Sequence, residues 1–300
     1  MANRWWIYQR DRFPVGVHSL LIAALCAGVL LFSSKARGNP DLPGLRTYAA
    51  AFVSVFLFFL QLRIADEFKD YQDDLKYRPY RPVPRGLVRL PELGRLGLAS
   101  AAVQLGLALW LRPRLVLPLV LVWAYMFLMT KEFFAATRLK SHPLVYLASH
   151  MVIMPLIYFY IAAWDWWATA SAMPRGLVWL LAAGFFTGTV IEIGRKIRAP
   201  QDEEPGVETY SALWGRRRAI RAWMAASALA SLLALVAAAC NQIAAPMAVL
   251  LGILLACEAV VAKRFLRSPA RGSGKLIEQM SGILILLLHL GMGAVIAVGG

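Results

Sequence analysis

Four carboxylates gather in a short stretch that follows an apolar run at residues 48–62. They are Asp66, Glu67, Asp70 and Asp74. On a helix, residues three and four positions apart share one face, so positions 67, 70 and 74 are expected to point the same way. Mg²⁺ prefers such hard oxygen ligands and usually combines them with phosphate oxygens of a substrate. The spacing predicts a Mg²⁺ site for a phosphorylated ligand; the alternative is a solvated acidic helix end.

Basic residues and prolines follow the acidic stretch at once. Residues 78–86 read Arg-Pro-Tyr-Arg-Pro-Val-Pro-Arg-Gly. Proline lacks a backbone N–H and resists helix formation, so three prolines between arginines predict a stiff, extended segment. Guanidinium groups bind phosphate through paired hydrogen bonds. Carboxylates beside such a segment, at the edge of a membrane span, indicate a site for a diphosphate carried on a lipid.

The composition is that of a polytopic membrane protein. Of the 300 residues, 59% are hydrophobic and 16% are charged, and the mean hydropathy is +0.58. The net charge of +15 could suggest a nucleic acid partner. However, the basic residues lie in short segments between apolar runs, where membrane topology places them. We therefore expect an integral membrane protein that contacts membrane lipid and binds no nucleic acid.

Apolar runs of nearly the ~20 residues needed to cross the hydrocarbon core follow one another through most of the chain. Because short segments join them, we expect an all-α fold with nine transmembrane helices, in which residues 1–300 form one domain. The runs cover about residues 14–34, 46–65, 95–111, 115–134, 143–164, 176–196, 219–239, 244–262 and 277–298.

The distribution of Lys and Arg predicts the orientation. With the N-terminus in the cytoplasm, the inner segments hold 25 of these residues and the outer segments hold six. Basic residues are retained on the cytoplasmic side, so this asymmetry favours a cytoplasmic N-terminus and an extracytoplasmic C-terminus. We expect the protein to lie in a bacterial inner membrane.

The two motifs together resemble the UbiA-type intramembrane prenyltransferase superfamily, to which 4-hydroxybenzoate polyprenyltransferases belong. Asp66 stands at the Asn position of the family's N-D-x-x-D-x-x-x-D motif, and Glu67, Asp70 and Asp74 stand at its aspartates. The segment Arg-Pro-Val-Pro-Arg-Gly at 81–86 is similar to the family's second element. The resemblance implies nine helices around a central cavity open to the cytoplasm, Mg²⁺ as cofactor, an isoprenyl diphosphate donor and a hydrophobic or aromatic acceptor.

The chain departs from the family pattern in the second acidic motif, D-x-x-x-D. Asp202 matches its last aspartate, whereas the upstream aspartate position falls on or near Arg198. Glu192 resembles an acidic residue found in some members. We expect Arg195, Lys196 or Arg198 to supply charge that a second metal ion usually provides; the alternative is that these residues only anchor a helix end at the membrane surface.

The resemblance also assigns roles to individual residues. Lys131 is similar to a family lysine that contacts diphosphate, though it could equally be a membrane-surface anchor. The predicted catalytic residues are Asp70, Asp74, Lys131 and Glu192. The predicted metal ligands are Asp66, Glu67, Asp70, Asp74 and Asp202. The predicted diphosphate-binding residues are Arg63, Lys69, Arg81, Lys131, Arg195, Lys196 and Arg198.

Prenyl transfer to a lipophilic or aromatic acceptor is the leading functional hypothesis. Two alternatives in the same superfamily share the metal site: cyclisation of the prenyl chain, and transfer of a phosphoribosyl group to a polyprenyl phosphate. A different class of protein, a non-catalytic lipid carrier, would show an inverted repeat with polar residues at mid-membrane. The polar residues here converge at one side instead, which favours an enzyme. The sequence does not indicate the oligomeric state.

Overall fold

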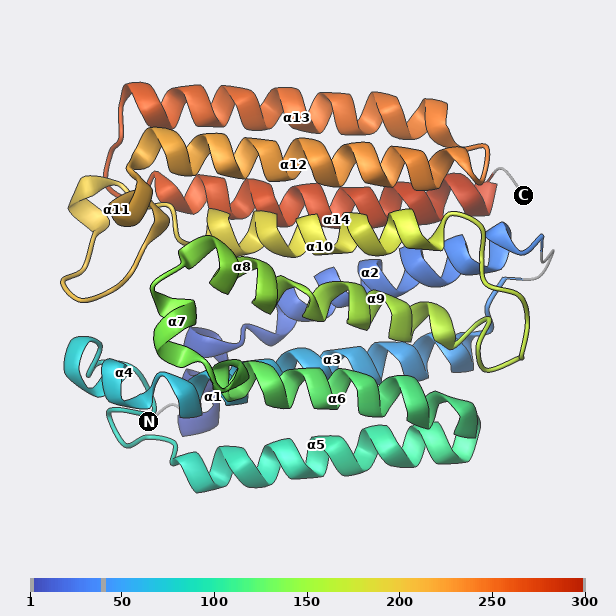
Figure 1. The fold of residues 1–300 in the computed structure, drawn as a ribbon, viewed down its shortest axis with the longest axis horizontal. Helices are drawn as coiled ribbons and strands as arrows, with labels where there is room; N and C mark the ends of the chain where they lie inside the picture. Colours follow the sequence, from blue (N-terminus) through green and yellow to red (C-terminus); the bar gives the residue numbers. More distant parts are fainter. Residues whose placement is uncertain (1–2, 39–41, 299–300) are drawn as a thin grey trace.

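Long helices run side by side across the molecule (Figure 1). The computed structural model describes residues 3–38 and 42–298, and this part of the chain contains helices and no strands. Within it, nine segments are long and apolar enough to cross a membrane, which confirms the predicted class. Their helices are α2 (Val15–Ala36), α3 (Leu45–Lys69), α5 (Leu90–Leu111), α6 (Val116–Thr130), α8 (Pro143–Met151) with α9 (Ile153–Ala163), α10 (Leu177–Gly194), α12 (Arg216–Ala239), α13 (Ala244–Arg267) and α14 (Gly274–Val298).

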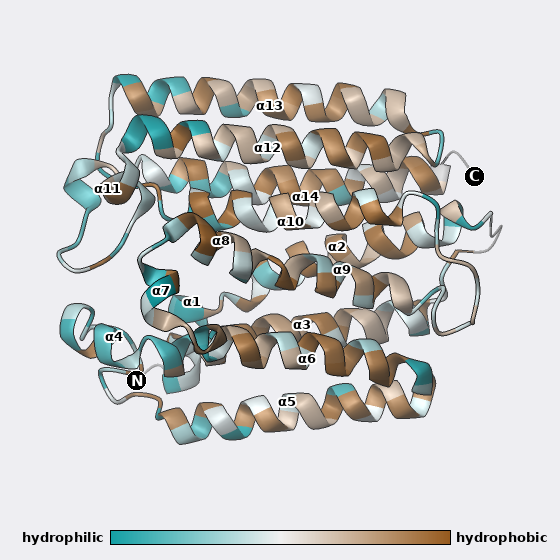
Figure 2. Cartoon of the chain, viewed as in Figure 1, coloured by the Kyte–Doolittle hydropathy of each residue, from teal (hydrophilic) through white to brown (hydrophobic). Residues whose placement is uncertain are grey.

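Short helices lie mainly at one end of the bundle, at the left of Figure 1; we call this the loop end. Hydrophobic residues dominate the long helices, whereas hydrophilic residues concentrate at the loop end (Figure 2). The short helices at this end are α1 (Arg4–Arg12), α4 (Tyr71–Tyr77), α7 (Ala136–Lys140) and α11 (Tyr210–Trp214), with 3-10 turns η2 (Glu132–Phe134) and η3 (Pro200–Asp202). The turn η1 (Pro113–Leu115) begins the fourth span at the opposite end.

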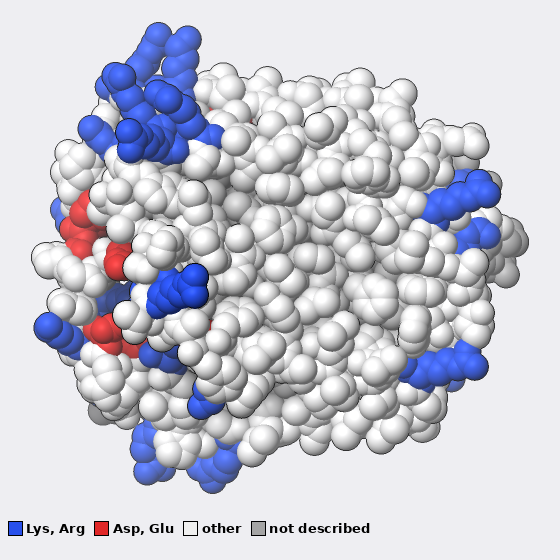
Figure 3. All heavy atoms as spheres, viewed as in Figure 1, with Lys and Arg blue, Asp and Glu red and all other residues white. Residues whose placement is uncertain are grey.

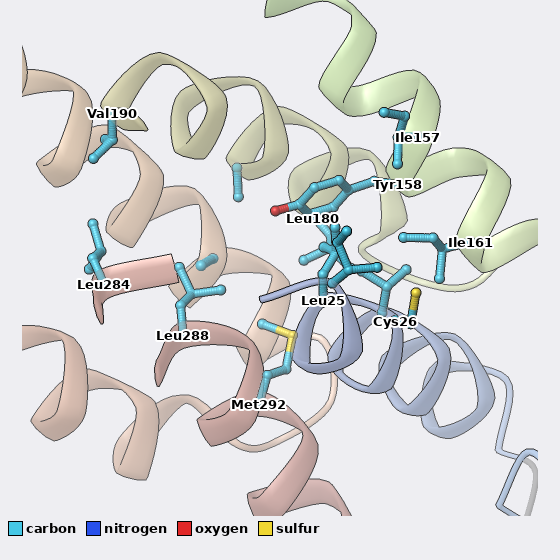
Figure 4. Close-up of a cluster of buried hydrophobic side chains, with 14 of the residues drawn as sticks. Leu25, Cys26, Ile157, Tyr158, Ile161, Leu180, Val190, Leu284, Leu288 and Met292 are labelled. Carbon is cyan, nitrogen blue, oxygen red and sulfur yellow. The ribbon is translucent and has the colours of Figure 1, made fainter. Parts of the chain in front are cut away.

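The core lies where α2, α9, α10 and α14 meet, and Figure 4 shows their apolar side chains converging. The Tyr158 hydroxyl within this core lies 2.9 Å from both Thr187 and His289, so the polar atoms are paired. Gly28 lets α2 approach α14, since a Cβ there would lie 2.7 Å from the His289 carbonyl oxygen. Small residues at helix contacts are what permits such close packing in a membrane protein.

The fifth span is bent, whereas the sequence predicted one continuous helix over residues 143–164. Helix α8 ends at Met151 and α9 begins at Ile153. Pro155 is the cause, because it lacks the N–H that would bond to the Met151 carbonyl and its ring crowds that carbonyl.

The proline-rich segment is folded into turns, which corrects the prediction that it is extended. The Arg85 N–H donates to the Arg81 carbonyl at 3.0 Å, and the Gly86 N–H donates to the Val83 carbonyl at 2.9 Å. Proline also fixes a φ that suits the first central position of a turn, and Gly86 takes φ +77°. The segment therefore folds back toward α4.

Candidate functional site

A bend at Asp70 divides the predicted carboxylate face. Helix α3 ends at Lys69 and α4 begins at Tyr71, so the single helix assumed for positions 67, 70 and 74 is interrupted. The bend leaves Glu67 and Asp74 on one side, where both contact the same arginine. Asp66 and Asp70 form a second group, in which each carboxylate raises the electrostatic energy of the other.

Glu67 and Asp74 are neutralised by three arginines, and we call these five residues the arginine cluster. The Arg12 guanidinium donates to Glu67 at 2.5 Å and lies 3.9 Å from Asp74. Arg81 binds both oxygens of Asp74 at 3.0 and 2.8 Å, and Arg78 lies 2.8 Å from the same carboxylate. Glu67 and Asp74 are 2% and 1% exposed, so arginine side chains rather than water stabilise their charges.

Asp66 and Asp70 form what we call the open carboxylate pair. The side chain of Asp66 is 36% exposed, and its ion-pair partners among the described residues are distant, Arg63 at 3.4 Å and Lys69 at 3.9 Å. Within the described part of the chain, the Asp70 carboxylate has no ion pair within 4 Å. Burial raises the pKa of Asp70, because a charged carboxylate is costly away from water. These two carboxylates are free to take a cation.

The end of α10 brings a basic group to the same region. Arg195 and Lys196 both bind the Glu192 carboxylate, at 2.5 and 2.9 Å. The Glu192 carboxylate raises the pKa of Arg195, and Asp66 is close enough to act on Arg195 in the same direction. Glu192, Arg195 and Lys196, at spacings of three and four, therefore carry one net positive charge at the end of α10, within electrostatic reach of Asp66.

Aromatic rings border these charges. The Lys69 ammonium donates to the Tyr146 hydroxyl at 2.9 Å, and the Tyr146 ring stacks on His150 with centroids 4.1 Å apart. The Nδ1 atom of His150 lies 2.9 Å from the Tyr146 carbonyl, which must accept, so Nδ1 carries the proton. Lys196 lies 5.6 Å from the centroid of the Tyr210 ring.

Three predicted site residues lie away from these contacts. The Asp202 carboxylate accepts a hydrogen bond of 2.7 Å from the backbone N–H of Gly272, between α13 and α14. Arg198 uses its backbone N–H to bind Ser211 at 2.8 Å. Lys131 ends α6 with an exposed side chain that forms no ion pair in the described residues. The five predicted metal ligands therefore do not converge in this structure.

The two long loops at this end touch each other. The Tyr80 hydroxyl donates to Glu204 at 2.7 Å. Gly206, at φ +74°, lies against the Tyr77 ring so closely that a Cβ would come within 2.2 Å of it. The contact joins the loop after α3 to the loop after α10, the two segments that carry the acidic motifs.

The residues present fit one divalent cation better than two. Among the residues that the structure describes, no three His, Cys, Asp or Glu side chains gather closely enough to hold a metal ion. The open carboxylate pair provides two carboxylates one helical turn apart, and neither has a close ion-pair partner among the described residues. Mg²⁺ is commonly held by one or two carboxylates, with water and substrate phosphate completing the octahedron. The pair therefore suits a Mg²⁺ ion that arrives with a diphosphate.

Sequence reasoning missed Arg12, Tyr146 and Tyr210. Arg12 is separated from Glu67 by 55 positions, and no motif connects them. The only available signal was its place in the basic segment before the first span, which topology already explains. The two tyrosines were indistinguishable from other aromatic residues at helix ends.

The described residues form a helical membrane protein in which carboxylates and basic side chains gather at the loop end. The chain belongs to the UbiA prenyltransferase family, because the sequence model of that family matches residues 19–276. It is thus an integral membrane protein of a family of prenyltransferases, as the motifs predicted.

Solved structures show the same fold. A UbiA homologue from Aeropyrum pernix K1 has a TM-score of 0.69 at 19% identity, covering 94% of this chain and 98% of the other. A UbiA homologue from Archaeoglobus fulgidus bound to DMAPP and Mg²⁺ has a TM-score of 0.55 at 16% identity, covering 94% and 99%. The same homologue bound to GPP and Mg²⁺ has a TM-score of 0.55 at 15% identity, covering 94% and 99%. No curated protein matches the chain.

Proposed function

We propose that the chain is a Mg²⁺-dependent intramembrane prenyltransferase that joins an isoprenyl group from an isoprenyl diphosphate to a lipophilic or aromatic acceptor. The observation that carries the proposal is the open carboxylate pair, Asp66 and Asp70, with Lys69 beside it and Arg195 within electrostatic reach of Asp66. The related structures from Archaeoglobus fulgidus that hold DMAPP or GPP with Mg²⁺ support this substrate class.

Asp66 and Asp70 would hold the Mg²⁺ ion. When bound, Mg²⁺ would neutralise charge that develops on the diphosphate as its bond to the prenyl carbon breaks. Lys69 and Arg63 would donate to phosphate oxygens of the diphosphate. These hydrogen bonds would replace their long contacts with Asp66. The arginine cluster would keep its own carboxylates and fix the position of α4.

The unit of Glu192, Arg195 and Lys196 would take the place of a second metal site. Its net positive charge lies within electrostatic reach of Asp66, and Glu192 orients both cations. A guanidinium held in place by a carboxylate binds phosphate without reorganising, which favours departure of the diphosphate. Further contacts from Lys131, Arg198 or Asp202 would require those side chains to move when substrate binds.

The central cavity that the family resemblance implies is proposed to open at the loop end, where the diphosphate headgroup would lie. The rings of Tyr146, His150 and Tyr210 would help to exclude water from this end of the site, since Tyr146 stacks on His150 and Tyr210 stacks on Trp214.

The test uses purified protein in lipid nanodiscs with Mg²⁺ and isoprenyl diphosphates of increasing length. Diphosphate release and lipid products are measured by mass spectrometry. Asp70→Asn should lower turnover at least 100-fold, whereas Asp73→Asn, an exposed position on the adjacent helix α4, should retain it. Wild-type activity in D70N, or an equal loss in D73N, would contradict the proposed site. A hydrocarbon formed without any acceptor would assign cyclisation instead, and binding without any diphosphate release would assign a carrier.

A further inference from the structure

Nine basic residues crowd one corner of the loop end, outside the site described above. They form a dense patch beside α12 and α13 in the space-filling view (Figure 3, upper left). Eight are exposed and Arg216 is partly exposed. We call this group the basic corner. It consists of Arg216, Arg217, Arg218 and Arg221 on α12, Lys263, Arg264 and Arg267 on α13, Arg271 in the following turn and Lys275 on α14.

The basic corner has no internal neutralisation. In the described part of the chain, none of the nine side chains forms an ion pair within 4 Å, whereas Arg12, Arg63, Arg78, Arg81 and Arg195 at the same end all do. An acidic residue that could serve, Glu278, lies one turn after Lys275 and is exposed without such a pair. Nine like charges at close quarters repel one another, so an anion from outside the chain would stabilise the corner.

The start of α12 makes this repulsion worse. Helix N-termini carry a partial positive charge, so cations in the first turns are unfavourable. Helix α12 begins with three consecutive arginines, has no acidic residue in its first turn, and its N-cap Gly215 offers no side-chain cap. Membrane orientation requires basic residues on this side but not at the start of α12. A helix C-terminus, such as the last turn of α13 with Arg264 and Arg267, is electrostatically more favourable for them. The N-terminus of α12 is therefore unbalanced unless an anion contacts it.

The surface next to the basic corner is apolar and outward-facing. Leu229 and Leu232 on α12 and Val260 on α13 are exposed, the last by 68%. In a membrane-spanning helix such residues face lipid tails. The basic side chains follow within a few turns, at the level where lipid headgroups lie. The anion that this corner meets at high local concentration is thus the phosphate of a membrane lipid.

We propose that the basic corner is a binding surface for anionic phospholipid headgroups. Arginine forks match phosphate oxygens in pairs, so the surface should select a lipid with net negative charge over a zwitterionic one with the same acyl chains. The inference goes beyond prenyl transfer and does not depend on it, because lipid retention requires no turnover.

The substitutions for the test avoid the turn between α13 and α14. That turn touches the second motif loop, since the Gly272 N–H binds Asp202 and Gly274 packs on the Ile197 carbonyl. The test variant is R217Q/R218Q/R264Q/R267Q. Its matched control removes four exposed arginines at the opposite end of the bundle, none with an ion pair in the described residues: R46Q/R112Q/R114Q/R175Q. If the test variant does not fold, the double variants R217Q/R218Q and R264Q/R267Q replace it.

Native mass spectrometry of the purified full chain measures retention of phosphatidylglycerol against phosphatidylcholine with the same acyl chains. Wild type and the control variant should retain several-fold more phosphatidylglycerol. The test variant should fall to its phosphatidylcholine level, and each double variant should lose part of the preference. Equal retention of the two lipids by wild type, or an unchanged preference in the test variant, would overturn the proposal. So would binding of a single-stranded oligonucleotide through the same four arginines without any lipid preference, which would assign the corner to nucleic acid.

Discussion

At the residue scale, Arg12 is the central link between α1 and the acidic motif. It is almost fully buried, and it contacts Glu67 and Asp74, which are buried as well. Removing one partner from such a group leaves uncompensated charge in a poorly solvated place. This typically costs about 3–5 kcal/mol.

We expect Arg12→Gln to lower the thermal midpoint of the purified protein by roughly 10 °C, because a glutamine amide cannot neutralise two carboxylates. Scanning fluorimetry in detergent measures this without substrate. The control is Arg10→Gln, since Arg10 is exposed and pairs only with its neighbour Asp11. Equal midpoints for R12Q and R10Q would show that the arginine cluster does not hold α1 in place.

Asp70 should behave in the opposite way, because its carboxylate is partly buried and forms no ion pair within 4 Å in the described part of the chain. Burial raises its pKa in the folded state. A carboxyl with a raised pKa favours folding when it is protonated, and this contribution is lost as the pH rises through the folded-state pKa. At neutral pH without Mg²⁺, Asp70→Asn should therefore melt at or above the wild-type temperature, and the difference should vanish in acid.

The same variant tests the metal. Mg²⁺ with an unreactive diphosphate analogue should raise the melting temperature of wild type and of Asp73→Asn, but not that of Asp70→Asn. A destabilised D70N at neutral pH, or one that keeps the full Mg²⁺ shift, would remove Asp70 from the proposed site.

At the element scale, the contact between the two motif loops depends on Gly206. A side chain there would collide with the Tyr77 ring and would also strain a backbone at φ +74°. Gly206→Ala should separate the loops, so trypsin should cleave residues 195–218 faster. Gly38→Ala is the matched control, because Gly38 has a similar φ of +71° with open space around its Cβ position, at the far end of the bundle.

A faster cut in G206A alone, together with reduced prenyl transfer, is the expected result. It would mean that the loops close over the headgroup site as one unit. If both glycine variants are digested at the wild-type rate, the Tyr77 contact does not hold the second loop.

At the scale of the whole molecule, the distribution of charge predicts the orientation. On the face drawn in Figure 3, Lys and Arg gather toward the two ends of the molecule, with the densest patch at the loop end. A reporter that is active only outside the cytoplasm should work when fused after Gly300 and fail when fused after Glu208. The reverse pattern would invert the orientation and place the proposed headgroup site on the other side of the membrane.

The sequence by itself determined the class of fold and the family. Apolar runs long enough to cross a membrane specify helices, because the lipid offers no partner for unpaired backbone groups. The acidic motif, with the Arg-Pro-Val-Pro-Arg-Gly segment after it, identified the family that the comparison confirmed. The contacts of Glu192 with Arg195 and Lys196, three and four positions further on, were seen only in the structure.

Only the tertiary structure decided which carboxylates are available. Glu67 and Asp74 look equivalent to Asp66 and Asp70 in the sequence, yet the bend at Asp70 turns them toward different neighbours. Arg12, on helix α1, pairs with Glu67 and Asp74. These residues are so far from Arg12 along the chain that no local sequence pattern predicts the contact. Long-range pairing of charge is set by how helices dock, and a periodicity describes only one helix at a time.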